Sequence, residues 1–191
     1  MNKKYSEVDL LGLKRHLQSG RSSFLYKLRY RRYFSREVTF SLRLPSTYLD
    51  RGEILCEDIE RLIEEEVEID HLLSMILLDF LKKMNKLGAM AAFQYLVDRY
   101  SKVLRIAHYK GEEEEFELIQ KPREPFETCE ISLTHNVAYR LELFLAELDY
   151  TFAHDMTVEK LIEIVYCHMI ETIKQDGGAT FTKAFIKYLK T

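Results

Sequence analysis

Apolar and polar residues alternate along residues 38–44, which is the clearest strand pattern in the chain. Every second side chain from residue 38 onward is apolar, as in a strand with one buried face. Pro45 has no backbone N–H to give to a sheet, so the strand is expected to end there. Ser46 or Thr47 is then expected to cap a following helix. A second alternating segment, residues 129–134, predicts another strand.

Most of the remaining chain has the apolar spacing of amphipathic helices. The predicted helices lie at residues 6–18, 22–34, 46–66, 70–84, 88–100, 141–148, 157–176 and 181–190. Asp70 and Thr157 are expected to be helix N-caps, and Gly177 with Gly178 to end the helix that Thr157 begins. Residues 103–109 and 116–120 are expected to form a hairpin, followed by a linker at residues 121–125.

The order of a strand followed by two helices occurs twice. Residues 40–43 match residues 131–134 at an offset of 91, whereas the second helices match at an offset of 89. The two-residue difference is expected to fall in the intervening turn, where changes of length are tolerated. The copies share pattern and spacing rather than sequence identity, so chance is the alternative explanation.

The composition is that of a folded chain of modest size. The 191 residues are 47% hydrophobic and 31% charged, which is enough to bury a core and excludes a disordered chain. No apolar run approaches the roughly 20 residues of a membrane helix, and the chain starts without the apolar stretch of a signal peptide. The three cysteines are far apart, which fits reduced thiols. We therefore expect a cytoplasmic protein that has no membrane partner.

The net charge of −3 conceals an asymmetry. Residues 1–43 carry eleven Lys and Arg against three acids, whereas the rest carries 17 basic and 28 acidic residues. A basic end on an acidic body suggests an arm that binds a polyanion; alternatively, the arm neutralises the body of its own chain. Basic and aromatic residues interleave over residues 26–36, and the candidate phosphate-binding side chains there are Lys27, Arg29, Arg31, Arg32 and Arg36.

The sequence offers no recognisable catalytic, phosphate-loop or metal-binding motif. The six histidines do not form an H-x-x-x-H pair, and no glycine-rich phosphate loop or nucleophile elbow occurs. His71 and His168 are expected to be solvated or core-edge side chains. We therefore expect no enzyme activity, no metal and no cofactor, with an active site assembled from distant residues as the alternative.

A short alternating strand followed by two amphipathic helices resembles the ribbon-helix-helix (MetJ/Arc-like) DNA-binding family. The piece F-S-L-R-L-P at residues 40–45 is similar to the opening of that family, and the resemblance covers residues 36–82 and 128–174. Two copies in one chain resemble the tandem accessory proteins of conjugative plasmids. The alternative is that the two strands belong to an unrelated α+β domain.

The resemblance implies a two-stranded antiparallel ribbon that enters the DNA major groove. It implies that Phe40, Leu42, Ile131 and Leu133 point inward, and that the base-reading side chains are Thr39, Ser41, Arg43, Ser132 and Thr134. It also implies phosphate binding at the starts of the second helices, near residues 70–72 and 157–159. Glu130 on the DNA face and the long first helix with Gly52 depart from the family pattern.

The predicted fold class is therefore α+β and predominantly helical, with two strand-helix-helix units paired through a short ribbon. The expected parts are a basic helical arm (1–36), a first unit (37–84), a helix and hairpin spacer (85–127) and a second unit with a terminal helix (128–191). The expected function is that of a DNA-binding regulator of transcription or accessory protein of a plasmid or mobile element, whose partner is double-stranded DNA. Self-association and a further protein partner are left open.

Two alternative functions come from other classes. In the first, the chain is an intracellular adaptor or inhibitor that docks an acidic protein through its Tyr- and Arg-rich N-terminal helix and uses its acidic helices as a second surface. In the second, residues 21–36 dock to an anionic membrane surface. The apolar face of that segment is small, which makes the second alternative the weaker one.

Overall fold

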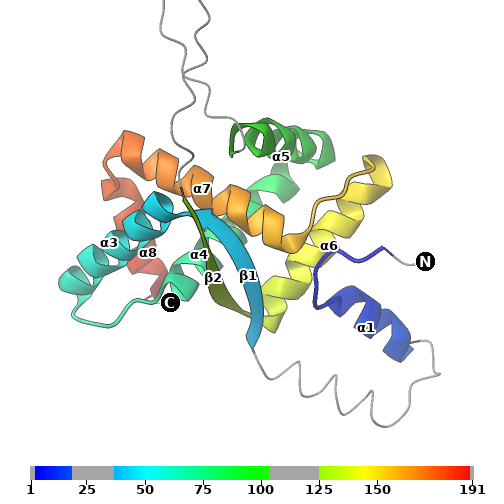
Figure 1. Ribbon diagram of the computed structural model, residues 1–191, viewed down its shortest axis with the longest axis horizontal. Coiled ribbons are helices and arrows are strands. Elements are labelled where there is room, and N and C mark those ends of the chain that lie inside the picture. The colour runs from blue at the N-terminus through cyan, green and yellow to red at the C-terminus, as the bar shows by residue number, and fades with distance from the viewer. Residues whose placement is uncertain (1–2, 19–36, 104–124, 190–191) are drawn as a thin grey trace, which may run out of the picture.

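A computed structural model of the protein describes residues 3–18, 37–103 and 125–189. Its architecture is α+β and predominantly helical, as predicted (Figure 1). The described elements are, in chain order, α1 (Leu10–Gln18), β1 (Glu37–Pro45), α3 (Ser46–Ile63), α4 (Ile69–Leu87), α5 (Ala89–Val103), β2 (Phe126–Thr134), α6 (His135–Thr151), α7 (Val158–Asp176) and α8 (Ala179–Leu189).

β1 and β2 run antiparallel and form one two-stranded ribbon. Ser41 lies opposite Glu130 at its centre, while Pro45 lies opposite Phe126 at one end. β2 begins three residues before the predicted strand. One face of the ribbon rests on helices, with β1 packed along α7 and β2 along α4 (Figure 1). An isolated two-stranded ribbon is only marginally stable, so this helical support is what allows it to persist.

The order of a strand and three helices occurs twice, as β1-α3-α4-α5 and β2-α6-α7-α8. The first residues of β1 and β2, of α3 and α6, and of α4 and α7 are each 89 residues apart. Gly88 and Gly177, also 89 residues apart, both have positive φ angles of 84° and 69° just before a third helix. The two-residue slip predicted between the strands and the second helices is therefore wrong: one offset of 89 covers the strands and the first two helices of each half, and the third helices start 90 residues apart.

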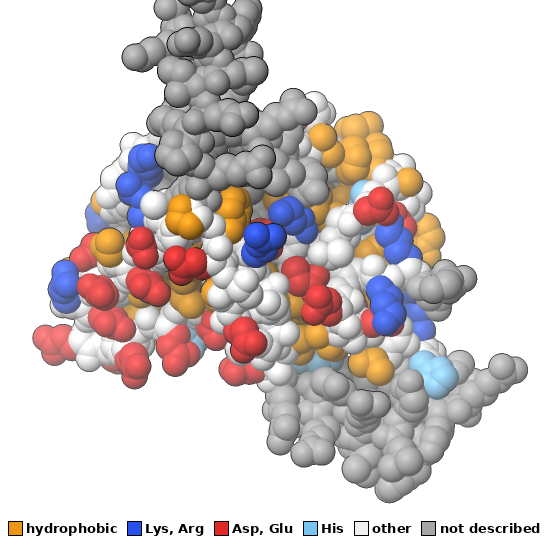
Figure 2. Space-filling model, viewed as in Figure 1, with side chains coloured by type: hydrophobic (Ala, Val, Ile, Leu, Met, Phe, Trp, Pro, Cys, Tyr) orange, Lys and Arg blue, Asp and Glu red, His pale blue; other side chains and the backbone are white. Residues whose placement is uncertain are grey.

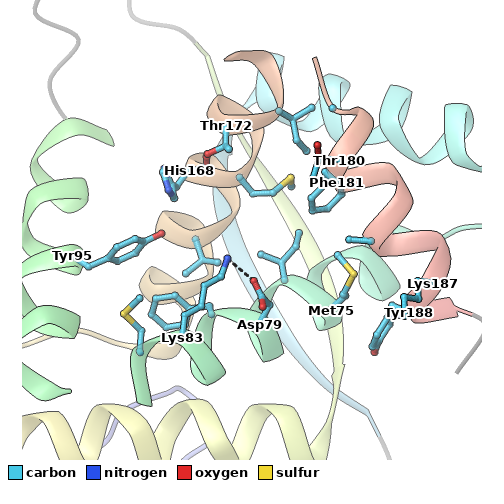
Figure 3. Close-up of a pocket in the computed structure, with 18 residues that line it drawn as sticks. Met75, Asp79, Lys83, Tyr95, His168, Thr172, Thr180, Phe181, Lys187 and Tyr188 are labelled. Carbon is cyan, nitrogen blue, oxygen red and sulfur yellow. Dashed lines mark hydrogen bonds and ion pairs between the residues drawn. The ribbon is translucent and has the colours of Figure 1, made fainter. Parts of the chain in front are cut away.

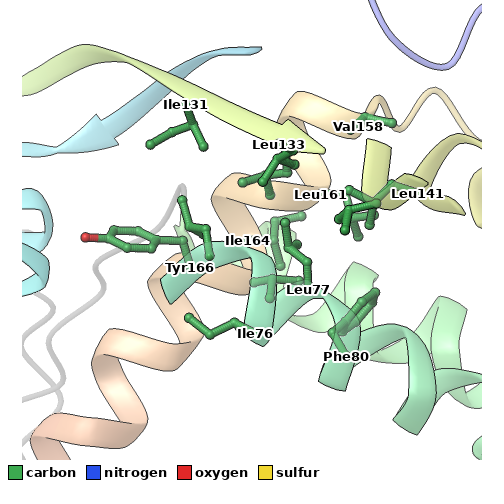
Figure 4. Close-up of a cluster of buried hydrophobic side chains, with 14 of the residues drawn as sticks. Ile76, Leu77, Phe80, Ile131, Leu133, Leu141, Val158, Leu161, Ile164 and Tyr166 are labelled. Atoms are coloured by element: carbon green, nitrogen blue, oxygen red, sulfur yellow. The ribbon is translucent and has the colours of Figure 1, made fainter. Parts of the chain in front are cut away.

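The core lies between the ribbon and helices α4, α6 and α7 (Figure 4). Ile131 and Leu133 enter it from β2, and Leu77 and Leu161 meet them from α4 and α7. All the apolar positions predicted for α4 and α7 are buried, namely Leu72, Leu73, Ile76, Leu77, Phe80, Leu81 and Met84, and Leu161, Ile162, Val165, Met169 and Ile170. Leu62, predicted to face the core from α3, is instead 66% exposed.

The segment before α1 and the helix itself are packed on the body of the protein. Glu142 of α6 is fully buried and accepts hydrogen bonds from the backbone N–H groups of Leu10 (2.9 Å) and Leu11 (2.7 Å), and from the Ser6 hydroxyl. A carboxylate therefore satisfies the free amides at the start of α1. Tyr5, Leu10 and Leu11 are buried, so this part of the predicted N-terminal arm belongs to the core.

Two predicted helix starts differ from those in the structure. The N-cap of α3 is Pro45, which makes no side-chain hydrogen bond, and Ser46 already belongs to the helix. The N-cap of α4 is Glu68, again without a side-chain bond, whereas Asp70 lies in the first turn. Asp70 does not cap its own helix because its carboxylate accepts a hydrogen bond from the backbone of Ser132 in β2.

The boundaries predicted for α7 are confirmed. The Thr157 hydroxyl accepts a hydrogen bond from the Lys160 backbone N–H at 3.4 Å, and Gly177 ends the helix in the left-handed region. The predicted helix at residues 22–34 lies outside the described residues. Most of the predicted hairpin at residues 103–120 does so as well, although Val103 itself ends α5 and is not in a strand.

Candidate nucleic-acid interface

The outer face of the ribbon is mostly polar and exposed; β1 buries every second residue, and β2 buries Ile131 and Leu133. Along β1, Val38, Phe40, Leu42 and Leu44 are at most 4% exposed, and the residues between them face away from the core. The predicted base-reading residues all lie on this outer face, with Ser132 half-buried and the others exposed: Thr39, Ser41, Arg43, Ser132 and Thr134. The inward positions implied by the ribbon-helix-helix resemblance, Phe40, Leu42, Ile131 and Leu133, are all buried.

Two of the predicted base-reading hydroxyls interact with each other. Thr39 lies opposite Ser132, and their Oγ atoms are 3.3 Å apart. Each hydroxyl can both donate and accept, so this contact leaves further hydrogen-bonding capacity at both residues. The pair thus places two small polar groups side by side on the outer face, one outward pair away from the central Ser41 and Glu130.

The outer face has a single cation and two carboxylates. Arg43 lies opposite Thr128, whereas Glu130 lies opposite Ser41 and Glu37 stands at the end of β1. The described face therefore has a formal charge of −1, and it does not attract phosphate by itself.

Carboxylates on the supporting helices hold the edges of the ribbon. Glu163 of α7 accepts a hydrogen bond from the Arg43 backbone N–H at 2.8 Å, and Asp70 of α4 accepts one from the Ser132 backbone N–H at 3.1 Å. The two donors, Arg43 and Ser132, are 89 residues apart and so occupy corresponding strand positions, whereas the two acceptors lie at different positions of α4 and α7. Lys160 pairs with the other Glu163 oxygen at 2.7 Å. These contacts satisfy edge amides that would otherwise be left unpaired, and they tie the ribbon to the helices.

Burial of Asp70 beneath the ribbon raises the pKa of its carboxyl above the ordinary value, and the hydrogen bond from the Ser132 amide opposes part of that rise. Burial likewise raises the pKa of the neighbouring Cys129 thiol, and the negative charges of Glu163 and Asp70 add to the effect. A raised pKa favours the protonated Cys129 thiol, which is a weaker nucleophile than the thiolate.

The starts of α4 and α7 are occupied by acceptors of the protein itself. Glu68 and Asp70 place two carboxylates at the start of α4. At the start of α7, Thr157 caps the helix, and the Glu159 carboxylate accepts a hydrogen bond from the Glu7 backbone N–H at 3.0 Å. Phosphate binding at these positions, which the family resemblance implies, would have to overcome this negative charge.

Acidic side chains crowd the side of the molecule formed by α3, at the left of Figure 2. The exposed acids of α3 and the loop after it are Asp50, Glu53, Glu57, Asp58, Glu64, Glu65, Glu66 and Glu68. Arg51 and Arg61 are the basic residues of the same stretch, and Arg61 pairs with Glu57 and Asp58 within the helix. This surface is suited to a basic partner and repels a nucleic acid.

The predicted phosphate-binding side chains lie outside the described residues: Lys27, Arg29, Arg31, Arg32 and Arg36. Within the part of the chain that the structure describes, no group of three His, Cys, Asp or Glu residues is arranged to hold a metal ion. The helices described here include none that is long and apolar enough to cross a membrane.

Sequence reasoning missed Glu163, which holds the β1 edge. The signal was present, because Glu163 is a single carboxylate within the apolar run from Leu161 to Val165. An acid at a core-facing position of a helix needs a hydrogen-bond donor when it is buried, so such a run indicates a structural acceptor. Glu142, which lies in the similar run from Leu141 to Leu145, follows the same pattern.

Comparison of the chain with protein-family models, with curated proteins and with solved structures finds no match. The resemblance to ribbon-helix-helix proteins therefore stays a prediction from the sequence.

Proposed function

We propose that the protein binds double-stranded DNA and acts as a regulator or accessory factor, with the outer face of the ribbon in the major groove. The observation that carries this proposal is a two-stranded antiparallel ribbon with one apolar face rooted in a helical core and one exposed, mostly polar face that carries Arg43 among hydroxyl side chains. The major groove, about 12 Å wide, admits a ribbon of this kind.

The placement of the helices supports the interpretation as two strand-helix-helix units within one chain. β1 packs on α7 and β2 on α4, so each strand contacts the second helix of the other half. The paired edge bonds of Arg43 and Ser132 repeat this exchange. Two interlocked copies would give this arrangement, because neither half buries its apolar faces alone.

Arg43 is the side chain best suited to read a base. It is exposed, it lies on the outer face, and its backbone N–H is held by Glu163, which fixes the point on the ribbon from which the side chain extends. A guanidinium matches the O6 and N7 acceptors of guanine in the major groove. Thr39, Ser41 and Thr134 have shorter side chains, and their hydroxyl groups would form hydrogen bonds with neighbouring bases.

The charge of the outer face is an argument for phosphate contacts by a different part of the chain. Because that face has a formal charge of −1, most of the affinity must come from basic residues elsewhere, and the basic segment at residues 26–36 supplies five candidates. Affinity is then expected to fall steeply with salt as counterions are released from the DNA. Sequence preference is expected to depend on the ribbon.

The test is fluorescence anisotropy of the full chain with labelled duplex DNA of mixed sequence across a salt series, followed by selection of a preferred sequence. Arg43→Ala is expected to weaken binding to the preferred sequence about five- to 150-fold, from ~1–3 kcal/mol per bidentate contact, and to leave binding to mixed sequence nearly unchanged. Arg61→Ala at the far end of α3 is the matched control and is expected to change neither. Equal loss on all sequences would refute base reading by Arg43, and absence of binding at about 50 mM salt would refute the proposal as a whole.

The acidic surface of α3 favours a second candidate, an adaptor that binds other proteins. Eight exposed carboxylates on one side of the molecule would attract a basic partner, while the Tyr- and Arg-rich N-terminal segment would dock an acidic one. This candidate predicts that charge reversal on α3 reduces association with a basic protein and has no effect in the DNA assay. It becomes the leading candidate if the anisotropy series shows no DNA binding.

A further inference from the structure

A groove of about 680 Å³ lies between α4, α7 and α8, with Tyr95 of α5 at one end (Figure 3). Its volume is within the range of about 300–1,000 Å³ that small-molecule sites occupy. α4 and α7 line it with corresponding faces, since Ile76 and Phe80 recur 89 residues later as Val165 and Met169. None of the lining residues belongs to the outer face of the ribbon.

Tyr95 of α5 and Ala184 of α8 both line the groove. Tyr95 of α5 packs on the Phe80 ring, with the ring centroids 5.6 Å apart. The side chain of Ala184 is a single methyl group, so a larger residue at this position would reach into the groove. Binding of an apolar group in a cavity lined by apolar atoms is favourable, because apolar surface is removed from water.

The walls are mostly apolar, and the charged residues among them carry a positive excess. Lys83, Lys187 and Asp79 are the charged lining residues, which gives a formal charge of +1 with His168 neutral. Lys83 pairs with Asp79 at 2.7 Å, and both side chains are more than half exposed (Figure 3). The groove thus combines an apolar interior with a cationic rim.

A further cation stands behind the Tyr95 end of the groove. The Arg99 guanidinium lies 3.6 Å from the centroid of the Tyr95 ring, and its Nη2 is 3.4 Å from Nε2 of His168, which lines the groove. Among the described residues, the Arg99 Nε is a buried side-chain donor that has no hydrogen-bond partner. Positive charge therefore accumulates here although the described chain as a whole is acidic.

We propose that this groove binds a medium-chain carboxylate, with its hydrocarbon chain along the apolar faces of α4 and α7 and its carboxylate at the lysine rim. Charge complementarity selects an anion over a cation or a neutral alcohol of the same length. The apolar walls select length, since each buried methylene contributes about a fourfold increase in affinity. The proposal is independent of DNA binding and is tested without DNA.

Calorimetric titration of the full chain with dodecanoate tests the proposal directly. Dodecanoate is expected to bind once per chain, at concentrations below those at which it forms micelles. Decanoate, shorter by two methylenes, is expected to bind about 15-fold more weakly. Dodecylamine is expected to bind at least tenfold more weakly than dodecanoate. Equal affinity for the amine and the carboxylate, or no saturable binding of dodecanoate, would overturn the proposal.

Methionine methyl groups report where the ligand lies. Met75, Met84 and Met169 line the groove, whereas Met90 and Met156 are elsewhere in the described structure. In spectra of methyl-labelled protein, dodecanoate is expected to shift the first three signals and leave the other two in place. Shifts confined to Met90 or Met156 would place the ligand outside the groove and refute the site.

Three variants test the charge of the rim, test the space in the groove and provide a control. Asp79→Asn raises the formal charge of the rim and is expected to tighten dodecanoate binding about two- to fivefold without affecting dodecanol. Ala184→Phe fills the groove and is expected to abolish binding of both ligands, with circular dichroism to verify the fold. Lys174→Met on the exposed side of α7, outside the groove, is expected to change nothing. Unchanged binding in both Asp79→Asn and Ala184→Phe would overturn the proposal.

Discussion

Replacement of Glu142 by alanine tests how the N-terminal segment is held. Glu142 is fully buried, and its two oxygens receive hydrogen bonds from Leu10 N (2.9 Å), Leu11 N (2.7 Å) and the Ser6 hydroxyl. Leu10 and Leu11 are 1% and 5% exposed, so their amides cannot turn to water while α1 stays in place. The variant Glu142→Ala removes all three acceptor contacts at once.

The magnitude follows from the two backbone amides. A buried donor that loses its partner costs about 1–3 kcal/mol, so Glu142→Ala is expected to lower the free energy of unfolding by about 2–6 kcal/mol. Glu142→Gln keeps one carbonyl oxygen, which can still accept two of the three bonds, but its amide group faces a donor. Its loss is expected to be about 1–3 kcal/mol. The loss of unfolding free energy cannot exceed the free energy needed to detach α1, because water reaches the freed amides once the helix has detached.

Urea denaturation measures the loss, and native-state hydrogen exchange locates it. Exchange at the amides of Leu10 and Leu11 is expected to accelerate far more than exchange in α7. Glu147→Ala is the matched control, since Glu147 lies on the exposed side of the same helix. A loss below about 1 kcal/mol in Glu142→Ala, with both amides still protected, would refute the capping role of Glu142.

The same carboxyl makes a pH-dependent contribution to stability. Burial is the largest influence on its pKa, which it raises above the ordinary value, and the three hydrogen bonds oppose it. A raised pKa means that the folded state holds this proton more tightly than the unfolded chain does. The resulting stabilisation is complete below the pKa of the unfolded chain and is lost as pH rises through the folded pKa. The stability advantage of the wild type over Glu142→Gln is therefore expected to shrink over that interval, and a gap that widens with pH would contradict this sign.

Three further predictions concern the ribbon and its supports. Glu130→Gln removes a carboxylate from the outer face and is expected to raise DNA affinity about two- to fivefold at low salt in the anisotropy assay, whereas a fall would indicate that Glu130 accepts a hydrogen bond from a base. Gly52→Ala would place a methyl group 3.1 Å from Cζ of Tyr166 and in overlap with its hydroxyl, which donates to the Tyr48 carbonyl oxygen at 2.9 Å; a loss of about 1–3 kcal/mol in urea denaturation is expected, and an unchanged midpoint would contradict it. Thr157→Ala removes the cap of α7 and is expected to cost about 1 kcal/mol in the same assay, with no change at all arguing against the cap.

The faces of β1 and the types of most described elements could be predicted because they follow from local periodicity. Val38 and Leu44 are buried because a strand turns every second side chain to one side, and the buried positions of α4 and α7 repeat with helical spacing. The cap at Thr157 and the stop at Gly177 depend only on the residues beside them. Local chemistry that involves neighbours in the sequence can be read from the sequence.

The alignment of the two strands could not be obtained in this way. A shift of two residues returns every strand side chain to the same face, so an offset of 91 satisfies the alternation as well as the observed 89. β2 buries only Ile131 and Leu133 among its nine residues, which leaves few positions to distinguish the two. The observed register, with Ser41 opposite Glu130, is selected by the packing of both strands on α4 and α7.

The roles of the acidic residues likewise depend on partners distant in the chain. Asp70 has the local surroundings of an N-cap, yet its carboxylate accepts from Ser132, 62 residues away. Glu142 receives its donors from residues more than 130 positions earlier. An acceptor goes to whichever buried donor tertiary packing leaves unpaired, and that donor has no signature in the sequence around the acid.

The sequence by itself thus determined an α+β chain rich in amphipathic helices, with one strand polar on its outer side and a basic segment ahead of an acidic body. Only the tertiary structure decided that the strands pair with Ser41 at the centre, that Glu163 and Asp70 hold the ribbon edges, and that a groove opens beside Ala184. The physical reason is the sequence separation over which each kind of interaction acts. Periodicity acts over a few residues along the chain, whereas register, buried hydrogen bonds and cavities depend on how surfaces far apart in the sequence meet.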